Sequence, residues 1–88
     1  MSTALPDLPQ RALSMLRAVA SGRAEMTCSC EPDLFVDGLA CCDQMTARLL
    51  SHAQLIRPAR PGAFGQRVPV RLTDAGRHVL QAEPLEAA

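Results

Sequence analysis

The fold is decided by one stretch of the sequence, residues 43–80. It begins Asp43-Gln-Met-Thr-Ala-Arg-Leu-Leu-Ser-His-Ala-Gln-Leu-Ile-Arg-Pro58, continues through a turn rich in glycine and proline, and ends Val68-Pro-Val-Arg-Leu-Thr-Asp-Ala-Gly-Arg-His-Val-Leu80. This order predicts a helix, a two-stranded hairpin with a basic tip, and a capped closing helix. The residues before it are expected to support these three elements.

The helix that opens this stretch has clear limits. Asp43 is a good N-cap, and the helix must end before Pro58. Residues that can face inward recur at helical spacing, namely Ala47, Leu50, Ala53 and Leu55 or Ile56. Met45 and Leu49 form a second apolar line beside them. With either line facing inward, we expect the outward side chains to be Gln44, Arg48 and Ser51.

The hairpin and the closing helix follow from turn residues and alternation. The cluster Pro-Gly-Ala-Phe-Gly at 61–65 predicts a turn. Residues 67–72 place Val68, Val70 and Leu72 on one side and Arg67, Pro69 and Arg71 on the other, which predicts a half-buried strand. Because Pro69 cannot donate to a ladder, its nitrogen side is expected to face an edge. Thr73 is expected to cap the closing helix, where Asp74 suits the positive N-terminus.

The first half of the chain carries weaker patterns. Apolar residues at helical spacing predict a helix from Leu8 to Ser21, with Asp7 as N-cap and Gly22 as its stop. Alternation over residues 24–29 favours a short strand. Residues 33–36 fit either a one-turn helix or a strand, and Asp37-Gly38 predicts a turn.

Two segments carry a family resemblance. Residues 72–80, Leu-Thr-Asp-Ala-Gly-Arg-His-Val-Leu, are similar to the Leu-Thr-x-x-Gly-Arg-x-x-Leu segment that follows the wing in MarR- and PadR-like winged-helix regulators. Residues 53–58 resemble the Ala-Gly-Leu-Ile segment that ends their recognition helix. Gln54 stands where that family has Gly, so we expect either an altered corner or a non-Gly residue at positive φ.

The resemblance implies a small α+β winged helix-turn-helix domain with three helices and a two- or three-stranded β-wing. The domain is expected over residues 8–82, between a flexible N-terminus (1–7) and a flexible C-terminal tail (83–88). In that family the recognition helix enters the major groove and the wing contacts the backbone or the minor groove. Carried over, helix 43–54 would read the groove and the wing over 57–71 would hold the backbone.

The resemblance also implies a set of DNA-binding residues. On the helix, Gln44, Thr46, Arg48 and Ser51 would face bases or phosphates, since Gln can bond adenine and Arg can bond guanine. On the wing, Arg57, Arg60 and Arg67 would hold phosphates, which position the protein without specifying a sequence. The alternative is that these arginines are only the solvated face of a small domain.

The charge distribution along the chain supports an anion-binding half. The net charge is zero, and every basic residue is Arg. Residues 25–43 contain five acidic residues and no Arg, whereas residues 44–77 contain six Arg and one acidic residue, Asp74. Segregated charge can build a local anion-binding face on a neutral protein. Two solvated faces of opposite sign would give the same pattern.

Four cysteines, Cys28, Cys30, Cys41 and Cys42, lie within fifteen residues. They would supply the thiolates of a zinc site if the turn at Asp37-Gly38 brings the two pairs together. Residues 25–34, Glu-Met-Thr-Cys-Ser-Cys-Glu-Pro-Asp-Leu, resemble the Glu-Leu-Cys-x-Cys-Asp-Leu box of ArsR-type metal-sensing repressors, which implies thiolate binding of soft metal ions. Packing as small buried hydrophobes and thiol redox sensing are the alternatives.

Other classes of function have little support. The sequence has no apolar run of membrane-spanning length and no leader of signal-peptide type, so we expect a cytoplasmic protein. With two Phe and no Trp or Tyr, an aromatic platform for single strands is poorly supported. A phosphate loop, a His-Glu-x-x-His motif and a nucleophile elbow are all missing, and His52 and His78 are far apart, so we do not expect an enzyme.

The sequence therefore predicts a double-stranded DNA-binding protein, a small transcriptional regulator that forms a homodimer through helix one and the closing helix. The first alternative is a winged-helix adaptor, of phage or host, that binds a protein through the acidic 25–43 segment. Exposure of Leu34-Phe35-Val36 would favour that adaptor. The second alternative is a metal- or thiol-responsive repressor that uses the four cysteines.

Overall fold

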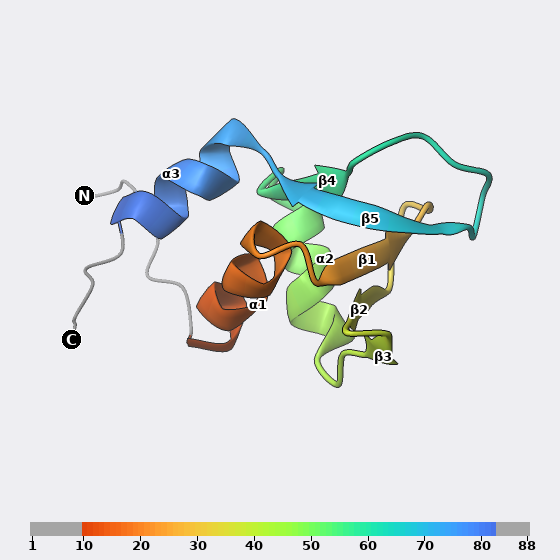
Figure 1. The fold of residues 1–88 in the computed structure, drawn as a ribbon, viewed down its shortest axis with the longest axis horizontal. Coiled ribbons are helices and arrows are strands. Elements are labelled where there is room, and N and C mark those ends of the chain that lie inside the picture. Colours follow the sequence, from red (N-terminus) through yellow and green to blue (C-terminus); the bar gives the residue numbers. More distant parts are fainter. Residues whose placement is uncertain (1–9, 83–88) are drawn as a thin grey trace.

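The computed structural model of the chain describes residues 10–82, which form three helices and five strands (Figure 1). The helices are α1 (Gln10–Ala20), α2 (Gln44–His52) and α3 (Asp74–Ala82). The strands are β1 (Ala24–Thr27), β2 (Leu34–Val36), β3 (Leu39–Ala40), β4 (Ile56–Pro58) and β5 (Arg67–Leu72). The expected flexible ends, residues 1–7 and 83–88, and the expected cap at Asp7 lie outside the described residues.

The strands form one antiparallel sheet in the order β3-β2-β1-β5-β4. The α+β class is confirmed, but the sheet has more strands than the two or three expected. The difference arises between β1 and α2, where residues 34–40 form a hairpin. Asp37 and Gly38, with φ of 55° and 82°, make the two-residue turn that Asp-Gly favours. The chain therefore forms β2 and β3 at the point where a standard helix-turn-helix would have a helix.

The hydrophobic core lies between the helices and one face of the sheet. On β5, Val68, Val70 and Leu72 are buried and the residues between them are exposed, which confirms the predicted alternation. Helix α1 buries Ala12, Leu13, Met15, Leu16, Ala18 and Val19 against this face. Helix α2 adds Ala47 and Leu50. Since the inward side of β4 and β5 faces the core, their arginines lie on the outer face of the sheet.

Strand β5 is not an edge strand, although Pro69 led us to expect that its nitrogen side would face an edge. The Pro69 carbonyl accepts a hydrogen bond of 2.8 Å from the N–H of Ala59. The nitrogen and oxygen of a strand residue lie on the same side, so the Pro69 ring nitrogen also faces Ala59. Ala59 comes one residue after the end of β4. Proline is accommodated because the regular β4–β5 ladder has already ended there.

One corner joins α2, β4 and α3. Gln54 has a φ of 64°, so of the two alternatives expected at this corner the structure has the second, a non-Gly residue at positive φ. The Thr73 hydroxyl donates to the Gln54 carbonyl at 2.6 Å and accepts from the Gly76 N–H at 3.0 Å, which confirms Thr73 as the cap of α3. Gly76 packs so closely on this corner that a Cβ there would overlap the carbonyl oxygen of Leu55. The corner therefore fixes α2 relative to the strands that follow it.

Candidate nucleic-acid interface

The two regions from which a DNA contact was expected are α2 and the wing, which we define as β4, β5 and the connecting residues 59–66. Figure 1 shows α3 at one end of the molecule and the wing loop projecting at the other. The predicted site residues divide between these regions, with four on α2 and three on the wing. The two groups differ in how many of their side chains have partners within the chain.

Gln44 does not point outward as expected. Its side chain is half-buried and bonds to the backbone of the β2–β3 hairpin. The amide nitrogen donates to the carbonyls of Leu34 at 3.0 Å and Cys41 at 2.8 Å, and the amide oxygen accepts from the Leu34 N–H at 2.7 Å. The sequence could not show this contact because it joins Gln44 to the backbone of Leu34, ten residues away in the chain. The Gln44 side chain is thus occupied by hydrogen bonds to the protein backbone.

Arg48 is held by the acidic segment. Its Nη2 donates to Asp33 Oδ1 at 2.5 Å, its Nε donates to the Pro32 carbonyl at 3.3 Å, and Glu31 lies 3.8 Å away. His52, one turn along α2, contacts the Cys30 carbonyl at 2.9 Å. The charge of Arg48 is therefore already balanced by carboxylates within the chain.

Thr46 belongs to the start of α2. Its hydroxyl donates to Asp43 Oδ2 at 2.6 Å, and its N–H donates to Asp43 Oδ1 at 3.1 Å, which confirms Asp43 as the N-cap. Together with the Arg11 guanidinium, the Thr46 hydroxyl lowers the pKa of Asp43 from 3.8 to about 2, and the hydroxyl makes the largest contribution. Ser51, the fourth predicted residue on α2, is half-buried. The two most exposed large side chains of α2 are instead apolar, Met45 at 74% and Leu49 at 61%.

The wing carries arginines of a different kind. Arg57 of β4 and Arg71 of β5 are directly opposite each other in the sheet register, and both are exposed. Arg60 lies in the loop that follows. Within the part of the chain that the structure describes, none of these three forms an ion pair. We call Arg57, Arg60 and Arg71 the wing arginines.

Arg71 was not among the predicted site residues, although the alternation of β5 had placed it on the outer side. Only the β4–β5 register could show that it faces Arg57.

Arg67, which was predicted as a site residue, is less available to bind an anion. Its Nε lies 3.2 Å from Glu25 Oε1 and its guanidinium lies 4.3 Å from the centre of the Phe35 ring. Strand β1 provides this partner because it pairs with β5.

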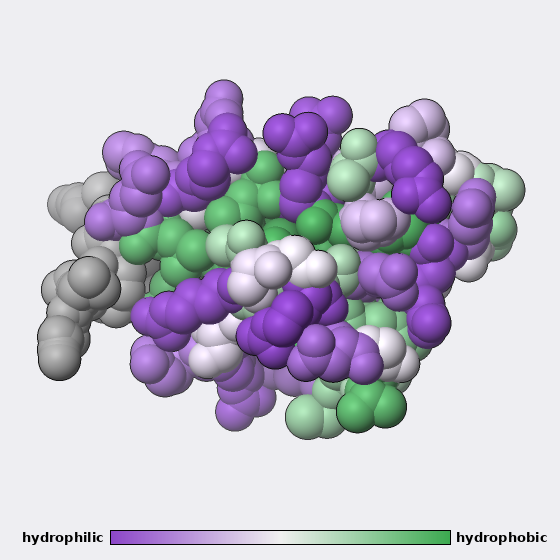
Figure 2. Space-filling view, in the orientation of Figure 1, coloured by the Kyte–Doolittle hydropathy of each residue, from purple (hydrophilic) through white to green (hydrophobic). Residues whose placement is uncertain are grey.

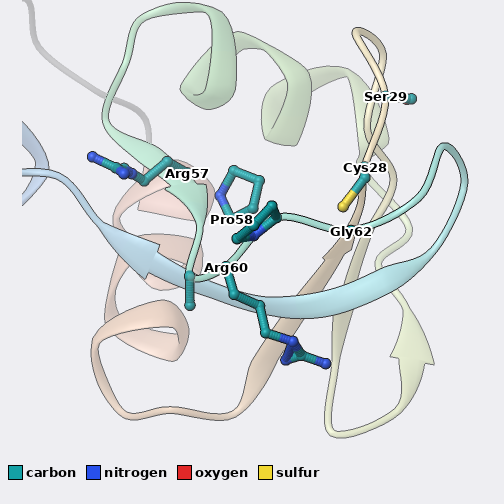
Figure 3. Close-up of a pocket in the computed structure, with 8 residues that line it drawn as sticks. Cys28, Ser29, Arg57, Pro58, Arg60 and Gly62 are labelled. Atoms are coloured by element: carbon teal, nitrogen blue, oxygen red, sulfur yellow. The ribbon is translucent and has the colours of Figure 1, made fainter.

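Two shallow hollows border the wing arginines. Arg57, Arg71 and Arg77 line one of about 500 Å³ at the start of α3, together with Asp74, which is paired with Arg77. Arg57 and Arg60 border the other, of about 490 Å³, where the Cys28 sulfur points toward Gly62 (Figure 3). In Figure 3 the two guanidinium groups extend to different sides of this hollow. The wing thus presents cations over an extended surface.

Like charges directly opposite in a sheet destabilise it unless an anion lies between or beside them. Arg57 and Arg71 are in that position, and no described carboxylate lies within ion-pair distance of either. A guanidinium binds phosphate oxygens through two parallel N–H bonds. The outer face of the wing therefore has the chemistry of a phosphate-binding surface.

The four cysteines do not come together as a site in the described residues. All four are free thiols; Cys28 and Cys41 are half-buried, and Cys30 and Cys42 are exposed. Over residues 10–82 no three His, Cys, Asp or Glu side chains gather closely enough to hold a metal ion. Cys28 packs beside Gly62 of the wing, and Cys41 packs against the core. The zinc site stays a prediction from sequence.

The apolar patch at residues 34–36 is largely covered. Leu34 is buried, and Phe35 and Val36 are half-buried in the sheet. This burial weakens the adaptor alternative as far as it depends on that patch.

None of the three described helices, α1, α2 and α3, is long and apolar enough to cross a membrane. Comparisons with family models, curated proteins and solved structures found no match for the chain.

Proposed function

We propose that this protein binds double-stranded DNA, as a small winged-helix transcriptional regulator, through the outer face of its wing. The observation that carries the proposal is the set of wing arginines, which have no carboxylate partner among the described residues and two of which face each other across β4 and β5. A two-stranded ribbon fits a DNA groove, and arginine contacts to phosphate supply sequence-independent affinity.

In this proposal α2 is not the principal reader of bases. Gln44 and Arg48 already have partners within the chain, and exchanging them for bases would leave backbone groups and carboxylates without theirs. Sequence preference would come instead from groove shape and from how easily the duplex deforms. This revises the role that the family resemblance implied for the helix and keeps the role that it implied for the wing.

Binding to a generic labelled duplex across a salt series tests the proposal. Each phosphate-bound arginine contributes about 0.9 to the slope of log K against log salt, so three give roughly 2.7. The variant with Arg57→Ala, Arg60→Ala and Arg71→Ala is expected to lose most of this slope. Arg17→Ala is the matched control, because Arg17 is an exposed arginine of α1 that forms no ion pair with a described residue. No binding by the wild type at low salt would refute the proposal.

A second candidate function is protein contact through α2. Met45 and Leu49 are four residues apart, so they lie on the same side of the helix, and both are mostly exposed. The partner we propose is a second copy of the chain, because a dimer would double the phosphate contacts of a neutral protein with three unpaired wing arginines. The homodimer expected from the sequence used α1 and α3 instead, whose described exposed residues are mostly polar.

Sedimentation equilibrium of the wild type and of a Met45→Ser/Leu49→Ser variant tests this second candidate. A dimer in the wild type and a monomer in the variant would support pairing through α2. An Arg17→Ala/Ser14→Ala variant on the exposed side of α1 is the control and is expected to associate as the wild type does. If that control were monomeric while the α2 variant stayed dimeric, pairing would belong to α1, as the sequence predicted.

A further inference from the structure

The tip of the wing presents one aromatic side chain to solvent. Phe64 is 87% exposed, the highest value among the large apolar residues described as exposed. It occupies the second position of a four-residue turn that is closed by a 2.8 Å hydrogen bond from the Gln66 N–H to the Ala63 carbonyl. Gly65, in the third position, has a φ of +83°, which a type II turn requires there. The turn thus projects the ring away from the protein.

This turn is fastened to the end of β1. The Gly65 N–H donates to the Cys28 carbonyl at 2.8 Å, and the Cys28 N–H donates to the Gln66 carbonyl at 2.9 Å. Inside the loop, the Ala63 N–H donates to the Gln66 side-chain oxygen at 2.9 Å. The backbone that carries Phe64 is therefore ordered before any ligand arrives, and binding need not order it.

Cationic side chains follow the ring along the wing. Arg60 lies in the same loop, and Arg57 and Arg71 lie farther from the tip, all without an ion-pair partner among the described residues. In Figure 2, apolar residues at the projecting end of the wing, on the right, are bordered by hydrophilic ones. A rigid apolar tip beside a surface of arginines resembles the apolar side chains that some proteins insert as wedges when they bend DNA from the minor groove.

We propose that Phe64 inserts between adjacent base pairs from the minor groove and bends the duplex. The inference rests on the proposed function, since the wing arginines must hold the phosphates beside the unstacked step. Unstacking opposes binding, and contacts that the bend allows between duplex and wing offset it. One ring is too little for a single-strand stacking platform, yet one ring is enough for a wedge. Sequence preference would then favour easily unstacked pyrimidine–purine steps.

An anionic membrane is the other surface that an exposed ring among arginines could meet. Stable membrane attachment takes two strong signals, such as an acyl chain and a polybasic patch. The described wing offers one ring and three unpaired arginines, and the sequence has no lysine to add to them. The duplex is therefore the better match, and lipid binding becomes an outcome of the test.

The test compares the wild type with Phe64→Ala and Phe64→Leu on two labelled duplexes of the same sequence, one intact and one with a central single-nucleotide gap. The gap removes most of the unstacking cost, so the wild type is expected to prefer the gapped duplex by roughly tenfold. Fluorescence energy transfer between the duplex ends reports the bend. Phe64→Ala is expected to lose both the preference and the bend, and Phe64→Leu, which keeps an apolar wedge, is expected to retain part of each.

The salt slope separates failure of the wedge from failure of the proposed function. Phe64→Ala is expected to keep the wild-type slope, because it removes no phosphate contact. If Phe64→Ala bends DNA as the wild type does, the wedge is overturned while the proposed function stands. If the wild type binds neither duplex, both fall. Co-sedimentation of the wild type, but not Phe64→Ala, with phosphatidylcholine–phosphatidylserine vesicles, together with no DNA bend, would overturn the wedge and assign Phe64 to lipid.

Discussion

Helix α2 and the wing both combine arginine with exposed apolar side chains. They differ in whether the guanidinium group already has a partner within the chain. On α2 the guanidinium of Arg48 is bound by Asp33 and the Pro32 carbonyl. On the wing, Arg57 faces Arg71 and has no ion-pair partner within the described part of the chain. An arginine on the helix that was expected to read the groove is thus a structural residue, while one outside that helix is free to bind.

The fold explains this difference. The acidic segment 25–43 contains β2, β3 and all of β1 except Ala24, and the β1–β2 connection lies against the outward side of α2 through Arg48 and His52. At the other side, β1 pairs with the first half of β5, so Glu25 reaches Arg67 but not the arginines nearer α3. Acidic and basic residues that are segregated along the sequence therefore partly pair with each other in the fold. The wing arginines are left without an ion-pair partner among the described residues.

The largest expected effect is at the corner that joins the two regions. Gly76→Ala would place a methyl group against the Leu55 carbonyl. In an ordinary helix this substitution stabilises by about 1 kcal/mol, but overlap with backbone should reverse the sign and destabilise by roughly 3 kcal/mol or more. Urea unfolding measures the change. Ala75→Gly, at the exposed neighbouring position, is the control and should cost only about 1 kcal/mol. A Gly76→Ala protein as stable as the wild type would mean that α3 does not clamp this corner.

The next effect concerns Gln44. Gln44→Ala removes three hydrogen bonds to the backbone of Leu34 and Cys41. The expected loss is about 1–3 kcal/mol of unfolding free energy, because half-buried backbone groups lose their partner. Ser51→Ala, on the same helix, should change stability by less than about 0.5 kcal/mol. If Gln44→Ala kept full stability and lost affinity for duplex DNA, Gln44 would be a base reader after all.

A matched pair of substitutions tests the comparison directly. Arg48→Ala is expected to lower stability by up to about 1 kcal/mol, since its ion pairs are partly exposed, and to leave the salt slope of duplex binding unchanged. Arg57→Ala is expected to lower the slope by about 0.9 and to leave stability unchanged or slightly improved, because it relieves a like-charge pair. The reverse result, with Arg48 controlling the slope, would return the phosphate contact to α2.

Much of the fold could be predicted from local patterns in the sequence. Asp43 as a cap, the alternation on β5 and the capping Thr73 all involve residues that act on their own backbone or on near neighbours, so a linear pattern contains them. At Gln54 the family motif left two alternatives, an altered corner or a non-Gly residue at positive φ, and the structure has the second.

The site was harder to predict because its properties depend on pairing across the sheet. Nothing near Arg71 in the sequence shows that Arg57 lies opposite, and nothing near Gln44 shows that Leu34 needs its amide. The ambiguity at residues 33–36, where one helical turn and a strand both stayed open, had the same origin. The choice between one helical turn and a strand was settled by β1, which pairs with β2, and not by the three residues themselves.

The smallest expected effect is a dependence on pH at the start of α2. The Asp43 carboxyl has a folded pKa of about 2, below its ordinary 3.8, because the Thr46 hydroxyl and then Arg11 bind its charged form. A carboxyl whose pKa is lower in the folded state stabilises the fold at pH values above its unfolded pKa, and this contribution is lost as the pH falls toward 2.

Asn also caps helices, so Asp43→Asn should preserve the start of α2 while removing the titration. Thermal unfolding followed by circular dichroism should therefore show the melting temperature of the wild type falling more steeply than that of the variant between about pH 4 and pH 2. Parallel curves would mean that the carboxylate of Asp43 gives α2 no more than an amide does.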